Sequence, residues 1–215
     1  MGIALKVLAL AAMSVLFALA SFGVATSADP DPRYRMKALA DAKEAADSGD
    51  YATAASLLQP YADQDDAVAQ NLLGVVYLSG GKGLPQDHAR AIALFRKAAE
   101  KGNGSSQRHL AIAYEKGQGV PVDPAMARTW YLKAANRGDA LAQLAVGKQC
   151  ASGQGMPQDF LQAYKWFTLA SSGAFTDSEK ANRDEALANR ASVAAKMTPS
   201  QISDAQGLVR TWSAR

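Results

Sequence analysis

Four aspartates recur along the chain at a nearly fixed spacing, and this recurrence constrains the fold more than any other feature. Asp50, Asp87, Asp123 and Asp159 lie 37, 36 and 36 residues apart, and much of the surrounding sequence recurs with them. A fixed period in this range is typical of an array of stacked structural repeats. The sequence therefore predicts a repeat protein, and it favours a binding surface over a reaction centre.

Each copy of the repeat has the spacing of two helices. In the first copy, one face of an α-helix, with the interval i, i+3, i+4, i+7, is held by Gln70, Leu73, Gly74 and Tyr77. The same interval returns further along at Ala91, Leu94, Phe95 and Ala98. We therefore expect each copy to be an antiparallel helix pair, and the stack of pairs to be the stable unit, because no single pair can bury its apolar face alone.

The loop between the two helices of a copy reads Gly-x-Pro-x-Asp. Its aspartate suits the N-cap of the second helix, where a carboxylate accepts hydrogen bonds from the unpaired amides of the first turn. Pro124 fits the first helical position. Gly102 and Gly138 fit the left-handed position after the second helix.

Several recurring positions are expected to be structural. Small residues let neighbouring helices approach closely, and large aromatic residues at Phe95, Tyr131 and Phe167 fill the space between pairs. Cys150 stands where the first two copies have Tyr77 and Tyr114. The structural repeat positions assigned in this way are Gly74, Tyr77, Asp87, Tyr114, Asp123, Trp130, Gly147, Asp159 and Trp166.

The repeated pattern, A-x-A-Q-x-x-L-G-x-x-Y-x-x-G-x-G-x-P-x-D-x-x-x-A-x-x-W-x-x-K-A-A-x-x-G, resembles the Sel-1-like repeat, a relative of the tetratricopeptide repeat. The resemblance implies an all-α fold, a right-handed α-solenoid of antiparallel helix pairs. The members that the chain resembles are bacterial secreted or periplasmic proteins. Its last residues also resemble the C-terminal tails of bacterial members of the family.

The sequence as a whole predicts six segments. We expect residues 1–28 to form a signal peptide, 33–66 a degenerate N-terminal capping repeat, 67–103 copy one, 104–139 copy two, 140–175 copy three, and 176–215 the C-terminal capping helices. Capping-box spacing at Thr176 and Glu179, and again at Thr198 and Gln201, marks the starts of the last two helices.

The N-terminus has the form of a secretory leader. Lys6 precedes an apolar run from Val7 to Ala20, and small residues follow, with cleavage expected after Ser27 or Ala28. The protein is then exported, periplasmic or secreted. The alternative is an uncleaved inner-membrane anchor, since Ile3 to Ala25 approaches the ~20 residues that span a bilayer, and only then is membrane contact expected.

Composition argues against several functions. The net charge of +3 gives no clustered basic face for nucleic acid. His88 and His109, the only histidines, lie in different predicted helices, so neither a metal nor a cofactor is expected. Cys150 is the only cysteine, which excludes an intramolecular disulfide. We expect a buried thiol there, with a reactive or dimer-forming thiol as the alternative.

A partner is expected to bind where the copies differ. In tetratricopeptide-like arrays the first helix of each pair lines the concave groove, and the resemblance transfers this geometry onto the Leu-Gly-x-x-Tyr positions. The groove residues assigned by this transfer are Asn71, Val75, Leu78, Arg108, Ile112, Glu115, Leu144 and Lys148. Apolar anchors mixed with a few charges suit an amphipathic helix or an extended peptide.

The leading hypothesis is a non-enzymatic adaptor of the bacterial envelope that binds a protein or peptide and no small-molecule substrate. The alternative is a weak hydrolase of β-lactams or cell-wall material, by analogy with a cysteine-rich branch of the resembled family. Its nucleophile would be Ser79, in a Ser-Gly-Gly-Lys sequence, but the companion motifs of serine β-lactam enzymes are absent from the sequence, as are that branch's paired cysteines.

Overall fold

The chain is helical throughout the part that the computed structural model describes, residues 32–154, 157–173 and 180–213. Its helices are α2 (Pro32–Asp47), α3 (Tyr51–Asp63), α4 (Ala67–Ser79), α5 (His88–Glu100), α6 (Gly104–Lys116), α7 (Pro124–Asn136), α8 (Ala140–Ser152), α9 (Phe160–Ser172), α10 (Lys180–Ala194) and α11 (Pro199–Thr211). These ranges contain no strand, only an isolated bridge between Gly81 and Leu84. The predicted all-α class is confirmed.

Two sequence predictions lie outside the described residues. They are the signal peptide, residues 1–28, and the capping box that joins Thr176 to Glu179. Among the helices that the structure does describe, none is both long enough and apolar enough to cross a membrane.

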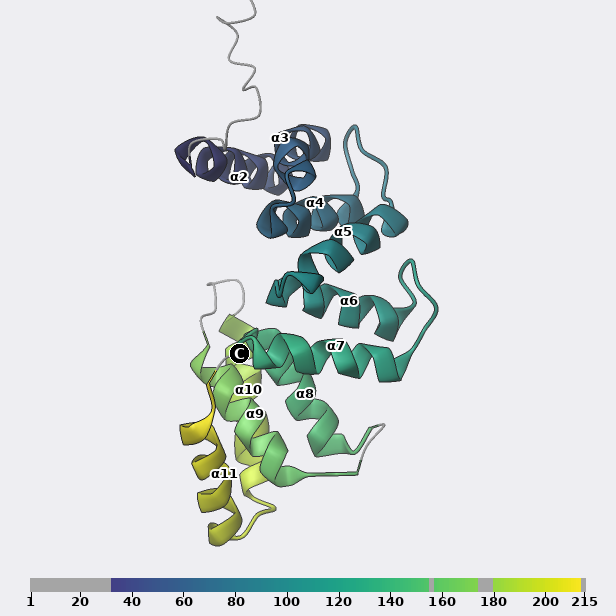
Figure 1. Cartoon of the computed structure of the whole chain (residues 1–215). Coiled ribbons are helices and arrows are strands. Elements are labelled where there is room, and N and C mark those ends of the chain that lie inside the picture. Colours follow the sequence, from purple (N-terminus) through teal and green to yellow (C-terminus); the bar gives the residue numbers. More distant parts are fainter. Residues whose placement is uncertain (1–31, 155–156, 174–179, 214–215) are drawn as a thin grey trace, which may run out of the picture. The chain divides into compact units, whose positions relative to one another are not determined.

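Contacts divide the chain after Ala38. In the first unit, the described residues 32–38 are the opening turns of α2, with Tyr34 and Met36 exposed. In the second unit, α3 to α9 each pack against the next helix in the chain (Figure 1). This order of packing is that of an α-solenoid built from helix pairs, as the period predicts.

Acidic and amide side chains begin the helices of the stack. Each recurring aspartate is the N-cap of a second helix, as at Asp87, whose carboxylate accepts from the amide of Arg90 at 2.9 Å. The first helices are capped as well, a regularity that the sequence analysis missed, by Asp66, Asn103 and Asp139. Both helices of copies one, two and three thus begin at a capping side chain.

The helices of a pair meet through a glycine in copies one and three. A Cβ atom added to Gly74 would lie 2.6 Å from the Phe95 ring, and one added to Gly147 would lie 2.6 Å from the Phe167 ring. Copy two has Ala111 at this position and Tyr131 in place of the phenylalanine. Two apolar clusters result, and Trp130 packs against both.

Buried glutamines join each copy to the one before it. The side-chain Nε2 atoms of Gln70, Gln107 and Gln143 donate to the carbonyl oxygens of Ala62, Ala99 and Ala135 at 3.1, 3.0 and 3.1 Å. Each carbonyl lies eight residues earlier, in the last turn of the preceding helix. A buried amide needs such a partner, because an unpaired one costs about 1–3 kcal/mol.

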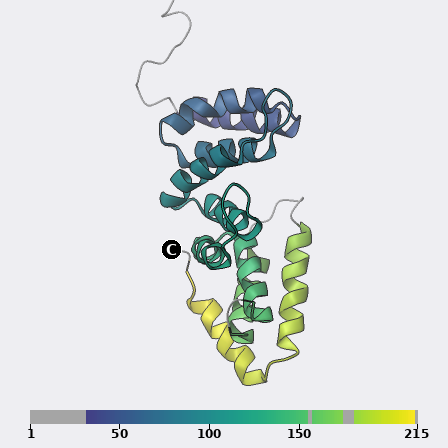
Figure 2. The same ribbon diagram turned by 90° about the vertical axis from the view of Figure 1, so that its right-hand side faces the viewer.

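The C-terminal helices depart from the period. Both α10 and α11 pack against α9, and Figure 2 shows them, in light green and yellow, on either side of the green helices. The start of α11 has the predicted capping box between Thr198 and Gln201, with Pro199 at the first helical position. The last helix of the repeat array is thus covered by both C-terminal helices.

Candidate partner-binding groove

A groove of about 700 Å³ lies between α6, α8 and α10. Its apolar lining comes from Ile112, Leu141, Leu144 and Ala145. Its charged lining comes from Arg108, Glu115, Lys116, Lys148 and Glu185. A groove that combines an apolar lining with a few fixed polar groups has the composition of a peptide-binding surface.

Hydrogen bonds and ion pairs fix the charged side chains of the groove. The guanidinium of Arg108 contacts the carboxylate of Asp139 at 3.0 Å, with side chains only 17% and 10% exposed. The Lys148 ammonium lies 2.5 Å from the Glu185 carboxylate at a half-exposed position, where such a pair contributes about 0–1 kcal/mol. The first pair is therefore a rigid part of the groove, and the second is weak enough to exchange.

Tyr131 orients Glu115 at the groove. Its hydroxyl donates to the Glu115 carboxylate at 2.9 Å. Burial, together with this hydrogen bond, raises the pKa of Tyr131 well above its ordinary value. The phenol therefore remains a hydrogen-bond donor at any physiological pH, which holds Glu115 in one orientation.

Five of the eight residues assigned to the groove line it. They are Arg108, Ile112, Glu115, Leu144 and Lys148. Leu144 is only 4% exposed, so it contributes packing and little accessible surface. A charged residue at this position would disrupt the core rather than test binding.

The three assigned residues of copy one do not line this groove. The amide oxygen of Asn71 accepts from the Ser106 hydroxyl at 2.8 Å and lies 3.3 Å from Nδ1 of His109. Val75 and Leu78 pack against the first apolar cluster. Asn71 thus contributes to the contact between copies one and two, and the other two side chains contribute to the core.

Sequence reasoning missed several lining residues, among them two on α8 and two on α10. Leu141 and Ala145 share the α8 face of Leu144 and Lys148, and a count of four residues along the helix would have found them. Asn182 and Glu185 belong to α10. That helix lies outside the repeat period, so no register transferred from the copies reaches it.

The recurring aromatic residues have mainly structural surroundings. The hydroxyl of Tyr77 accepts from Arg90 at 3.4 Å, and that of Tyr114 accepts from Arg96 at 3.2 Å. Lys133 and Lys165 lie 4.1 Å above the rings of Trp130 and Trp166. The aromatic positions therefore pack between helices and carry cations on their outer faces.

Within the described residues, side chains that could act as nucleophiles or metal ligands lie apart from one another. Ser79 is the exposed last residue of α4, and its hydroxyl makes no hydrogen bond within those residues. Cys150 is a free thiol, 3% exposed, and burial raises its pKa. No cluster of potential metal ligands occurs in the same part of the chain.

His109 is held neutral by its surroundings. Its ring stacks on Phe95 with the centroids 4.6 Å apart. Burial, helped by the charge of Arg108, lowers the pKa of His109 from 6.5 to about 4. The imidazole is therefore a packing and hydrogen-bonding group near neutral pH.

Comparisons with known proteins agree with the repeat architecture. The family model described as Sel1 repeat matches residues 67–103, 104–139 and 140–174. The crystal structure of a Sel1 repeat protein from Oxalobacter formigenes is 27% identical, with a TM-score of 0.62 over 71% of this chain and 57% of that one.

A second solved structure extends the likeness. It is a protective antigen of uropathogenic Escherichia coli with an SLR fold, 28% identical, with a TM-score of 0.63 over 89% of this chain and 43% of that one. The chain thus spans about half the length of these relatives. A search of curated proteins gave no significant match.

Proposed function

The chain belongs to the Sel1 repeat family, and on this premise we propose that it is a non-catalytic adaptor that binds a segment of another protein in the groove between α6, α8 and α10. Sel1 repeats are in general modules of protein–protein interaction. The observation that carries the proposal is the groove itself, whose apolar lining is bordered by one rigid and one exchangeable ion pair.

The partner segment suited to this groove is extended or amphipathic. Its apolar side chains would contact Ile112 and Leu141, while an acidic side chain would take the place of Glu185 at Lys148. Export to the periplasm or beyond is part of the same proposal. It is supported by the leader-like sequence of residues 1–28.

The repeat register offers a matched pair of variants for testing the groove. Val75 and Ile112 occupy the same position in copies one and two, and both are partly buried, but only Ile112 lines the groove. We expect Ile112→Asp to weaken binding of the crosslinked partner by at least about tenfold, or 1.4 kcal/mol. Val75→Asp is expected to leave binding unchanged once both variants are shown to fold.

The partner itself is found by photo-crosslinking in the native cell, with a photoreactive residue at the exposed Lys148. Affinity is then measured with the purified pair. Equal binding by Ile112→Asp and wild type would remove the groove from the proposal. Reversal of charge at Lys148, followed by restoration with Lys148→Glu and Glu185→Lys together, checks the exchangeable ion pair separately.

A further inference from the structure

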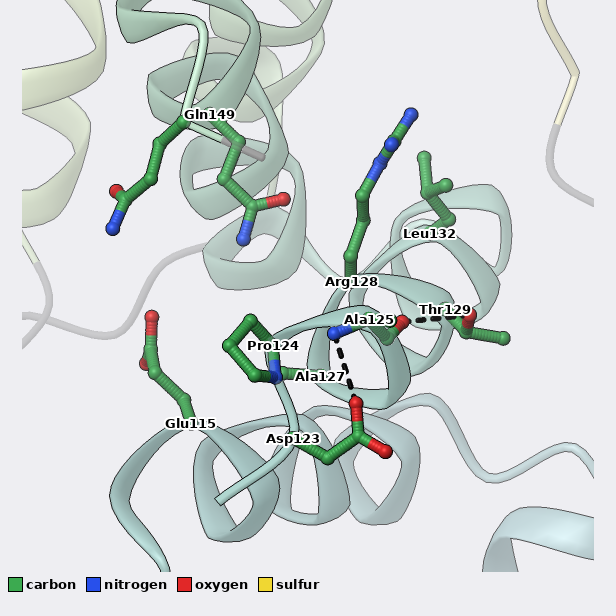
Figure 3. Close-up of a pocket in the computed structure, with 10 residues that line it drawn as sticks. Glu115, Asp123, Pro124, Ala125, Ala127, Arg128, Thr129, Leu132 and Gln149 are labelled. Atoms are coloured by element: carbon green, nitrogen blue, oxygen red, sulfur yellow. Dashed lines mark hydrogen bonds between the residues drawn. The ribbon is translucent and has the colours of Figure 1, made fainter. Parts of the chain in front are cut away.

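A pocket of about 840 Å³ lies beside the groove, between the first half of α7 and the end of α8. Figure 3 shows Pro124, Ala127 and Arg128 of α7 on one side and Gln149 of α8 opposite them. Glu115 and Gln149 line both this pocket and the groove. The pocket therefore continues the groove along the edge of copy three.

In copy two a tyrosine extends into the corresponding region. The hydroxyl of Tyr114 reaches Arg96 of α5, the second helix of the preceding copy. One period later the tyrosine is replaced by Cys150 and the arginine by Leu132. Leu132 lines the pocket, so the pocket opens where both members of the Tyr114–Arg96 pair are exchanged for smaller or apolar residues.

Cys150 lies next to the pocket wall without forming it. It follows Gln149 in α8 and is buried, and the charge of Arg128, a lining residue, acts on its thiol. A tyrosine at this position, oriented as Tyr114 is, would direct its ring toward Leu132 and occupy the pocket. The shorter cysteine leaves that space empty.

The polar groups of the pocket suit a phenol. The amide oxygen of Gln149 is buried and accepts no hydrogen bond within the described residues. Gln149 also lines the pocket, so an O–H donor bound there is suited to supply the partner that this oxygen lacks. Pro124, Ala127 and Leu132 supply an apolar lining for a ring. An aromatic ring that carries one hydroxyl donor satisfies both features.

We propose that this pocket is a specificity site that takes a tyrosine side chain of the protein partner, in place of the tyrosine that copy three lacks. The proposal rests on the adaptor function in one respect, that the tyrosine belongs to a partner protein. The ring packs against Leu132 and Pro124, and its hydroxyl donates to Gln149. The groove then binds the residues that flank the tyrosine.

The probe is the neutral peptide N-acetyl-Gly-Tyr-Gly-amide, titrated into the full, reduced chain and followed by amide NMR spectra. We expect saturable shifts at the Gln149 side-chain amide and the Arg128 and Thr129 backbone amides, with a dissociation constant of about 1 mM. The peptide with phenylalanine in the centre should bind about threefold more weakly, and the peptide with alanine should not bind measurably.

The decisive variant restores the copy-two pair with Cys150→Tyr and Leu132→Arg together, and it should weaken tyrosine binding at least about tenfold. Cys150→Ser, which leaves the space open, is the matched control and should bind as wild type does. If the double variant does not fold, Leu132→Arg alone gives the test, because it places a charge in the apolar lining.

Equal binding of the tyrosine and alanine peptides would overturn the proposal, as would undiminished binding by the folded restored variant or the absence of saturable shifts up to about 10 mM peptide. The adaptor function is judged separately. Loss of the partner in Ile112→Asp without any tripeptide binding would leave the groove in place and remove only the tyrosine site.

Discussion

Copies two and three have the same repeat period but differ in the side chains that fill the space between their helices. Copy two has Ala111 against Tyr131 and a tyrosine at position 114, whereas copy three has Gly147 against Phe167 and Cys150. Both keep a capping aspartate that accepts from the amide three residues later, and a buried glutamine that donates to the carbonyl eight residues earlier. The positions that the two copies share stabilise the helix pair, and the positions that differ determine where a cavity remains at the surface.

The largest expected effect is at the aromatic position that is Tyr131 in copy two and Phe167 in copy three. Variants there distinguish the contribution of ring packing from that of a hydrogen bond. Phe167→Ala should lower the free energy of unfolding by about 3–5 kcal/mol, because it removes a buried ring from a closed core. Tyr131→Phe in copy two keeps the ring and loses only the hydrogen bond to Glu115, so about 1 kcal/mol is expected.

Urea unfolding followed by circular dichroism measures both changes. A loss below about 1 kcal/mol in Phe167→Ala would show that the two copies do not depend on the ring between their helices.

The next effect concerns His109 of copy two. The equivalent residues of copies one and three are Leu72 and Ala145, so copy two alone has a histidine here. The folded chain holds the pKa of His109 at about 4, below the ordinary 6.5, so the unfolded chain binds the proton first as pH falls. Stability due to the neutral histidine is therefore complete above pH 6.5 and is lost between pH 6.5 and 4.

A pKa difference of this size corresponds to at most about 3 kcal/mol. Unfolding free energies at a series of pH values should show a decline over that interval that is smaller in His109→Leu, the residue of copy one. Identical pH profiles for the variant and the wild type would contradict the burial of this ring. Asn71 keeps its hydrogen bond from Ser106 in the variant, so the comparison isolates the imidazole.

A smaller effect is expected where the two helices of a pair touch. Gly147→Ala places a Cβ atom against the immobile ring of Phe167 and should cost about 1–3 kcal/mol. Ala111→Gly in copy two meets no such contact and should cost only about 1 kcal/mol, through helix propensity.

A double-mutant cycle with Phe167→Leu measures the contact directly. The cost of Gly147→Ala should fall in that background, because the ring atoms nearest the new Cβ are gone. Additive changes would mean that the glycine is required for another reason.

The smallest effect tests what the copies share. Asp123→Ala and Asp159→Ala each remove an N-cap and should lower the free energy of unfolding by about 1 kcal/mol, while the corresponding asparagine variants should be nearly neutral. Thermal unfolding of the four proteins measures this. Clearly unequal losses in the two alanine variants would show that the caps of copies two and three are not equivalent.

Periodic positions were predictable from the sequence because each has the same neighbours in every copy. The helix pairs, the caps at the aspartates and the close approach at Gly74 and Gly147 all belong to this class. The recurring glutamines were visible as well, but their partners are backbone carbonyls, which carry no sequence signal. Their role required the structure.

The groove was only partly predictable because its members depend on the next copy in the chain. Val75, Ile112 and Lys148 share one register position, yet only the last two line the groove. Asn71 faces Ser106 and His109, whose counterparts in copy three are Ala142 and Ala145. A rule transferred from one copy to another cannot include such neighbours, nor can it reach α10.

The hydrogen bonds of the buried glutamines allow whole copies to be removed or inserted without loss of a partner. Each amide bonds to a carbonyl only eight residues earlier, so removal of residues 104–139 would place Gln143 eight residues after Ala99, the present partner of Gln107. Every copy boundary would again have a glutamine and an acceptor, and the insertion of a period works in the same way. Duplication within the gene can therefore lengthen or shorten the array without new solutions for its buried amides, so that relatives of different length need share only the period.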